Sequence, residues 1–257
     1  MDFKHKGIDT AARLTARQAA SATEQGVEFV GRYLVEPSMS KALTLGEIKI
    51  LHGANLGILL IWETTANRAK YGESAGAEDG ARARNLAATY AVPTGTVIYF
   101  AVDYDAPKSD YQAIDAYLCA AKAACAPYKC GVYGKADLIN SVKADAYMQC
   151  VAWSYGVQSH KTNVYQYEWQ GGTNAKALAS KIGVAVDLDG TDDMTAAGIW
   201  MPPKPKQWYD DAMAWADRQG LIKDGRPDDP VTRAELATVL YRIFGPEDDK
   251  ENSGLLS

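Results

Sequence analysis

A continuous apolar run at residues 97–102, followed by two acids, constrains the fold more than any other stretch. The run reads VIYFAV and leads directly to Asp103 and Asp105. An unbroken run of this length suits a strand that is buried on both faces, as in a parallel sheet covered by helices. Side chains two residues apart share a face of a strand, so both carboxylates are expected to project together from its carboxyl end. Polar residues at that end are typical of α/β enzymes.

Strand-like and helix-like segments alternate through most of the chain. Short apolar or β-prone runs predict strands at residues 6–9, 27–34, 57–62, 97–102, 130–133, 147–153, 163–169 and 184–188. Capping boxes and glycines predict helices at 15–26, 44–53, 77–91, 109–126, 136–142 and 175–182. This alternation predicts an α/β fold, a (β/α)8 TIM-like barrel with some short or missing helices. An open doubly wound sheet is the alternative.

A proline-rich break divides the chain. Residues 199–206 hold three prolines in a short run, which is typical of a stiff linker. We therefore predict a barrel at 1–198, a linker at 199–206, a small helical hairpin module at 207–245 and a disordered acidic tail at 246–257. In the hairpin, Thr232 and Glu235 form a capping box ahead of an apolar face. So short a hairpin buries little core, so it is expected to pack on the barrel or on another copy of itself.

Composition and charge argue against several classes of function. The formal net charge is −5, so nucleic acid is not an expected partner. The N-terminus has no apolar stretch after its charges, and no run is long enough to span a bilayer, so neither a signal peptide nor a membrane partner is expected. The four cysteines lack metal-ligand spacing and are expected to be reduced core thiols. No cofactor or metal is expected.

Acidic residues recur at the predicted strand ends. They are Asp9, Glu63, Asp103, Asp105, Asp187 and Asp189. In a closed parallel barrel these ends form one rim, where neighbouring carboxylates repel one another and raise some pKa values. Two carboxyl groups with different pKa values can act as general acid and general base, as glycoside hydrolysis requires. Helix capping explains any single one of these acids equally well, and a divalent metal site is the rival chemical interpretation.

Aromatic residues gather at the same strand ends. They are Tyr33, Trp62, Tyr104, Tyr133, Trp153, Tyr155, Tyr167 and Trp169. Rings that point between strands and helices are expected to be core. Those that face the rim would suit a carbohydrate cleft, because flat amphipathic rings bind polar ligands.

Short motifs on successive predicted strands together resemble a known family. The motifs are GID at 7–9, FAVDYD at 100–105, GVY at 131–133, AW at 152–153, YQY at 165–167 and VDLD at 186–189. They resemble the family 25 glycoside hydrolases, the lysozymes of phages and bacteria that cut peptidoglycan glycan chains. They are still more similar to a related lysozyme-like barrel family, long classified as a domain of unknown function. The resemblance covers about residues 6–198.

The resemblance implies a role for each matched residue. Asp105 would be the general acid, Asp103 would stabilise the developing positive charge or orient the substrate acetamido group, and Asp9 and Asp187 would complete the acidic rim. Tyr133, Trp153 and Gln166 would line the sugar cleft, with Tyr33, Glu63 and Asp189 as further substrate contacts. The lysozymes have Glu at the position of Asp105 and usually Asn at that of Asp189. Both departures agree with the lysozyme-like family, and Glu63 is a candidate for the missing longer carboxyl.

The C-terminal stretch resembles a single S-layer homology module, chiefly through TRAE at 232–235. In that family the arginine of the motif contacts acidic cell-wall polysaccharide, which implies wall binding through Arg233. Such modules normally occur as three tandem copies. A single copy therefore implies a homo-oligomer or weak wall binding, and a simple oligomerisation hairpin is the alternative.

Taken together, the resemblances predict a muramidase-like peptidoglycan hydrolase of the phage or prophage endolysin type. Its expected partners are peptidoglycan and secondary cell-wall polysaccharide. The expected location is the host cytoplasm, followed by action at the cell wall after release. Two alternatives stay open. One is a non-catalytic glycan-binding protein, because Asp105 is one methylene shorter than Glu, and the other is a metal-dependent wall hydrolase such as a deacetylase.

Overall fold

The computed structural model describes residues 3–203, 213, 215–216, 218 and 233–244 of the chain. The chain separates into two compact units, residues 1–203 and 204–257, and each is described by itself. None of the helices in the described part is long and apolar enough to cross a membrane. The tail predicted at 246–257 and the first helix of the predicted hairpin lie largely or wholly outside the described residues.

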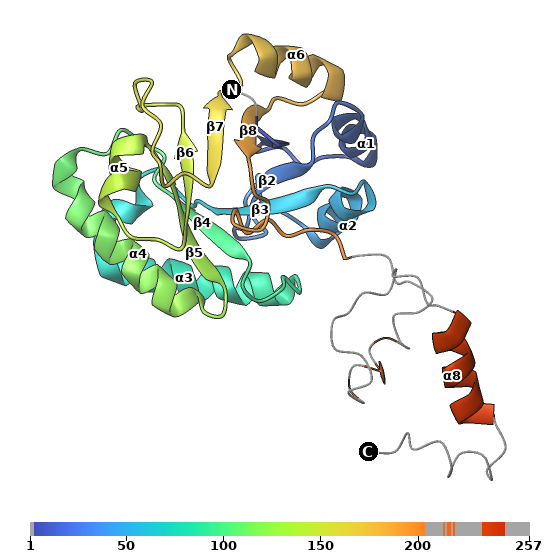
Figure 1. The fold of residues 1–257 in the computed structure, drawn as a ribbon. Helices are drawn as coiled ribbons and strands as arrows, with labels where there is room; N and C mark the ends of the chain where they lie inside the picture. Colours follow the sequence, from blue (N-terminus) through green and yellow to red (C-terminus); the bar gives the residue numbers. More distant parts are fainter. Residues whose placement is uncertain (1–2, 204–212, 214, 217, 219–232, 245–257) are drawn as a thin grey trace. The chain divides into compact units, whose positions relative to one another are not determined.

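Eight strands close into a barrel in sequence order (Figure 1). They are β1 His5–Asp9, β2 Phe29–Tyr33, β3 Gly57–Trp62, β4 Val97–Ala101, β5 Lys129–Gly134, β6 Ala146–Cys150, β7 Val164–Glu168 and β8 Asp187–Thr191. Strands β1 to β7 are parallel to their neighbours, whereas β8 is antiparallel to both β7 and β1. The predicted α/β barrel is thus confirmed, but the expectation that all eight strands are parallel is wrong.

Helices lie between the strands on the outside of the barrel (Figure 1). They are α1 Ala16–Glu24, α2 Leu45–Gly53, α3 Gly72–Thr89, α4 Tyr111–Cys125, α5 Ala136–Ser141 and α6 Thr173–Ile182. The capping box of Thr15 and Gln18 opens α1 as predicted. Helices α3 and α4 pack closely because α3 presents glycine: a Cβ on Gly76 would lie 2.0 Å from the carbonyl oxygen of Tyr117. A six-residue α5 and the lack of a described helix between β6 and β7 fit the expected short or missing helices.

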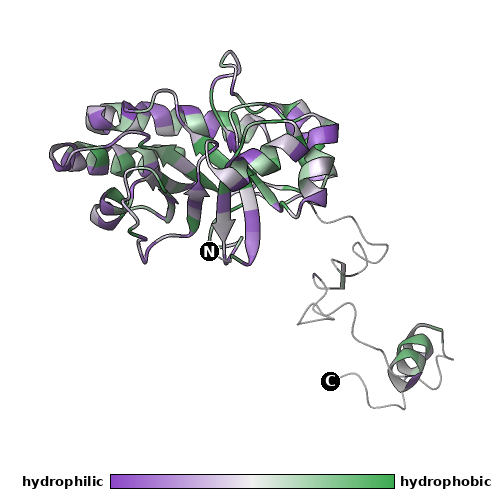
Figure 2. Cartoon of the chain, turned by 90° about the horizontal axis from the view of Figure 1, so that it is seen from above, coloured by the Kyte–Doolittle hydropathy of each residue, from purple (hydrophilic) through white to green (hydrophobic). Residues whose placement is uncertain are grey.

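Apolar side chains fill the barrel interior and the layer between strands and helices. Figure 2 shows the apolar residues on most strands and on the helix faces that meet them. Three cysteines, Cys125, Cys130 and Cys150, are buried free thiols as expected, but Cys119 is exposed. The barrel unit continues past the predicted boundary at residue 198, because Trp200 pairs with Ile58 of β3 and is buried.

The second unit contains helix α8, Arg233–Phe244, at the place where the capping box predicts one. Leu236, Val239 and Leu240 on this helix are each about half exposed. The linker residues 204–206 and Thr232 lie outside the described residues.

Candidate active site

Acids and aromatic residues meet in one pocket at the carboxyl ends of the parallel strands. Its free volume is about 20 Å³, and its lining residues are Asp9, Tyr33, Ile61, Glu63, Ala101, Asp103, Tyr133 and Gln166. They come from β1 to β5 and β7, or from the residues that directly follow these strands. The parallel part of the barrel therefore brings together acids that are far apart in the sequence, as the strand-end pattern predicts.

Gln166 on β7 connects two of the acids. Its amide Nε2 donates hydrogen bonds to Asp9 Oδ2 at 2.7 Å and to Asp187 Oδ2 at 3.1 Å. Its Oε1 accepts one from the Tyr133 hydroxyl at 3.0 Å. Because the donors and acceptors of the amide are all matched, its side chain holds both carboxyl groups in place.

Asp9 is the most perturbed carboxyl group that lines the pocket. It is 5% exposed. Its pKa is raised from an ordinary 3.8 to about 7: burial contributes most, the negative charge of Asp187 adds to the rise, and the hydrogen bond from Gln166 opposes it. A carboxyl group that keeps its proton near neutral pH can donate it to a leaving group. The local chemistry thus makes Asp9 a candidate general acid.

The reversed direction of β8 places its two acids at different depths. Asp187, which starts the strand, pairs with Asp9 at the rim, whereas Asp189 pairs with Gly7 deeper in the barrel. Asp189 is fully buried, and neither carboxyl oxygen has a hydrogen-bond partner among the described residues. Burial raises its pKa well above the usual range, and Asp9 and Asp187 add to this rise. Asp189 does not line the pocket, and its role as a substrate contact stays a prediction that its burial does not favour.

Lys41, which the sequence analysis did not identify, supplies a cation on the opposite side of the pocket. Its Nζ lies 3.0 Å from Glu63 Oε2 and 4.2 Å from the centre of the Tyr33 ring. Burial raises the pKa values of Glu63 and Asp103, and the positive charge of Lys41 opposes the rise in both. Lys41 therefore favours the ionised forms of the two acids nearest to it.

Asp105 does not share the pocket with Asp103. Strand β4 ends at Ala101, so the two acids lie beyond the strand, where side chains no longer alternate. Asp103 lines the pocket, whereas the Asp105 side chain is 48% exposed and pairs with Lys135 Nζ at 2.5 Å. The expectation that both carboxylates project together is wrong for this reason. The role of Asp105 as general acid stays a prediction.

Trp153 does not line this pocket, and Arg233 belongs to the second unit. Strand β6 ends at Cys150 rather than at residue 153, and Trp153 occupies a turn with a φ of 55°. It is absent from the pocket lining, so its expected contact with sugar is not supported by its position. Arg233 is an exposed residue of α8 in the second unit.

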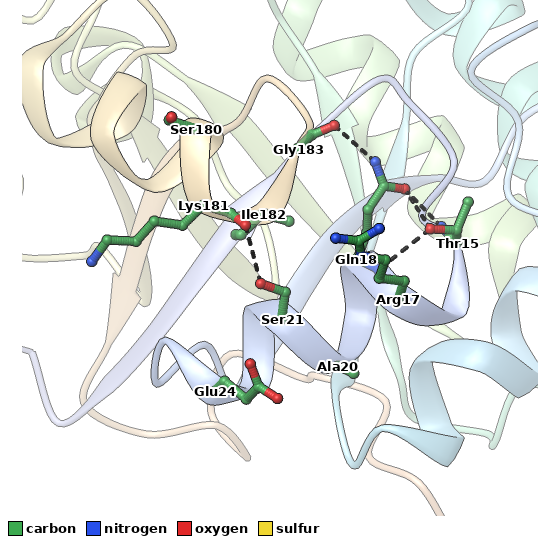
Figure 3. Close-up of a pocket in the computed structure, with 10 residues that line it drawn as sticks. All are labelled: Thr15, Arg17, Gln18, Ala20, Ser21, Glu24, Ser180, Lys181, Ile182 and Gly183. Atoms are coloured by element: carbon green, nitrogen blue, oxygen red, sulfur yellow. Dashed lines mark hydrogen bonds between the residues drawn. The ribbon is translucent and has the colours of Figure 1, made fainter.

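Two further observations concern other parts of the surface. No group of three or more His, Cys, Asp or Glu residues within the described part is arranged to hold a metal ion. A polar groove lies between α1 and α6, where Gln18 Nε2 donates to the Gly183 carbonyl and Ser21 Oγ donates to that of Lys181 (Figure 3). None of the rim acids lines this groove, and its hydrogen bonds join the two helices.

Comparison with known proteins identifies the family of the barrel. Residues 20–196 match the model of the Rv2525c-like, glycoside hydrolase-like domain. The chain belongs to this family. The match confirms the glycoside hydrolase-like barrel that the sequence motifs indicate, and it ends before the stretch that resembles an S-layer homology module.

Solved structures share the fold at low sequence identity. The Mycobacterium tuberculosis Tat-secreted protein Rv2525c, crystallised with L-tartrate, is 21% identical with a TM-score of 0.64, over 76% of this chain and 98% of that one. An uncharacterized Bacillus stearothermophilus protein is 18% identical with a TM-score of 0.55, over 76% and 100% of the two chains.

One relative is similar to this chain in sequence over a shorter stretch. Uncharacterized protein FadG of Bacillus subtilis is 32% identical over 115 residues, which are 42% of this chain and 20% of FadG.

Proposed function

We propose that this member of the family hydrolyses glycosidic bonds in the glycan of bacterial cell walls. One observation carries the proposal: a single pocket holds three carboxyl groups in unequal electrostatic environments. Burial raises the pKa of all three, but Asp187 adds to the rise at Asp9, which reaches about 7, whereas the positive charge of Lys41 opposes the rise at Glu63 and Asp103. Glycoside hydrolysis uses one carboxylic acid and one carboxylate in this way.

In the proposed reaction, Asp9 transfers its proton to the glycosidic oxygen as the bond to the anomeric carbon breaks. The carboxylate of Asp103 stabilises the positive charge that develops on the sugar ring, and Glu63 activates the water that adds to the anomeric carbon. Gln166 keeps the Asp9 carboxyl group aligned through its 2.7 Å hydrogen bond. After the reaction Glu63 carries the proton taken from water and Asp9 is ionised, and transfer of this proton from Glu63 to Asp9 through solvent restores the starting state.

The experiment is digestion of purified peptidoglycan with the full chain, followed by mass spectrometry of the soluble products. Wild-type protein should release fragments with new reducing ends, and Asp9→Asn should abolish this release. Asp105→Asn tests the acid that the sequence resemblance implies. If Asp105→Asn is inactive and Asp9→Asn retains full activity, our assignment of the acid is wrong. Loss of activity in a chelator would instead favour the metal-dependent alternative.

A second candidate function is glycan binding without cleavage. The free volume of the pocket, about 20 Å³, is far below the roughly 300 to 1,000 Å³ of typical ligand pockets. A space of this size admits about one water molecule, so a sugar would rest on the rim of the pocket rather than fill it. Cosedimentation with cell walls in the absence of released fragments, for wild type and variants alike, would establish this function.

Attachment to wall polysaccharide is a separate proposal that concerns the second unit. We propose that Arg233 binds acidic polysaccharide, that the hairpin supports self-association, and that the protein acts at the wall as an endolysin. Arg233→Ala should lower cosedimentation with polysaccharide-containing walls while cleavage of purified glycan is unchanged. A mass measurement in solution tests self-association, and lysis of host cells on expression with a pore-forming protein tests the endolysin role.

A further inference from the structure

The loop after β7 holds an exposed indole ring, one residue before a backbone N–H that donates to Asp187. Trp169 follows Glu168, the last residue of the strand, and is 61% exposed. A single exposed aromatic residue is common on protein surfaces and needs no explanation by itself. Trp169 differs from such residues because both its ring and its backbone are held in place.

Glycine residues provide the surface on which the ring rests. A Cβ on Gly171 would lie 2.0 to 2.3 Å from three carbons of the six-membered part of the indole. The ring therefore packs directly on the backbone of Gly171, where any side chain would displace it. The next residue, Gly172, donates its backbone N–H to the Trp169 carbonyl at 2.8 Å, which closes a tight turn around the indole.

Two carboxylates fasten this turn on either side. Glu168 Oε1 accepts hydrogen bonds from the backbone N–H groups of Asn174 and Ala175 at 2.6 and 2.9 Å, which ties the turn to the start of α6. On the other side, the Gln170 N–H donates to Asp187 Oδ1. Asp187 in turn accepts from Gln166, which also holds Asp9. A continuous series of hydrogen bonds thus joins the backbone beside the indole to the pocket.

We propose that Trp169 is a stacking platform for a sugar ring of the glycan whose neighbouring part rests on the rim of the pocket at Asp9. This inference rests on the substrate class proposed above and adds a binding residue outside the pocket. The apolar face of a pyranose ring packs well on an amphipathic indole. Because the indole is already fixed, little side-chain entropy is lost when a sugar binds. The platform also offers contact area that the small pocket lacks.

The test is calorimetric titration of the full chain with a β-1,4-linked hexamer of N-acetylglucosamine, together with the peptidoglycan digestion. Trp169→Ala should weaken binding about tenfold, and Trp169→Phe should retain part of the affinity because a smaller ring remains. Tyr155→Ala is the matched control, since Tyr155 is 83% exposed on the segment between β6 and β7. It should bind as wild type does. Circular dichroism shows whether each variant is folded.

The outcomes separate the platform from the proposed function. If wild type binds the hexamer and Trp169→Ala, folded, binds equally well, the platform is refuted while hydrolysis stands. Equal losses in Trp169→Ala and Tyr155→Ala also refute it, because a specific platform would not be matched by the control. If wild type neither binds the hexamer nor cleaves peptidoglycan, the proposed function fails and the platform fails with it. If wild type binds the hexamer without cleaving peptidoglycan, and only Trp169→Ala loses this binding, the result supports the platform and the glycan-binding alternative.

Discussion

Replacement of Asp9 by Asn should stabilise the protein above neutral pH while abolishing activity. In the unfolded chain Asp9 loses its proton near its ordinary pKa of 3.8, whereas in the folded protein it keeps the proton up to about 7. Between these values the unfolded state binds fewer protons, so the free energy of unfolding falls as pH rises. At about 1.4 kcal/mol per pKa unit, the total loss is roughly 4 kcal/mol and is complete above about pH 7. Asn cannot ionise, and its carbonyl oxygen can still accept the bond from Gln166.

Urea unfolding of wild type and Asp9→Asn, at a series of pH values from about 4 to 8, measures this effect. The difference in unfolding free energy should be near its minimum at the acid end and should grow in favour of the variant toward the alkaline end. Removal of the Asp9 charge also lessens the rise in the pKa of Asp189, which changes stability in the same direction. Asp105→Asn is the control, because its side chain is 48% exposed and pairs with Lys135. A difference for Asp9→Asn that does not change with pH would refute the argument.

Three further predictions concern charged side chains of the barrel. Lys41→Met removes the cation that lowers the pKa values of Glu63 and Asp103, so the acid limb of the pH–activity profile should move to higher pH. Glu47→Gln removes the carboxylate that lies 2.7 Å from the fully buried Arg32 guanidinium. The free energy of unfolding, measured with urea, should fall by about 3 kcal/mol or more. Glu28→Gln is the control, because Glu28 is partly exposed and its replacement should change that free energy very little. Asp189→Asn should leave cleavage at neutral pH within about twofold of wild type, because burial already favours the neutral form of the acid that it replaces.

Most strands could be predicted from the sequence because they are short apolar or β-prone runs. Strand β3, Gly57–Trp62, has the predicted bounds, and every residue in it is buried. Strand β8 is the exception, since its sequence DLDGT carries little strand signal. It forms because both of its edges are paired, to β7 and to β1, when the barrel closes. Because this pairing depends on the whole barrel, it leaves no local pattern in the sequence. The apolar run at 184–188 therefore predicts a strand that begins three residues before β8.

The acidic site could be predicted in part for a related reason. Asp9, Glu63 and Asp103 follow the carboxyl ends of parallel strands, and this placement alone brings them to one pocket. Asp105 lies too far beyond β4 for strand alternation to fix its direction. Lys41 lies in a turn ahead of α2, and it reaches Glu63 only through the packing of that turn on the barrel. Neither motif nor periodicity marks such a residue, although it sets the charge balance of the pocket.

The burial of Asp189 bears on how its difference from the asparagine usual in the lysozymes affects the charge of the site. A carboxylate where the lysozymes usually have an amide would be expected to add a negative charge to the site. Asp189 is fully buried, and burial, Asp9 and Asp187 all favour its protonated form. A protonated carboxylic acid has nearly the shape of an asparagine amide. The substitution therefore adds less negative charge to the site than an exposed carboxylate would, and Asp9, which lines the pocket, remains the acid of the proposed reaction.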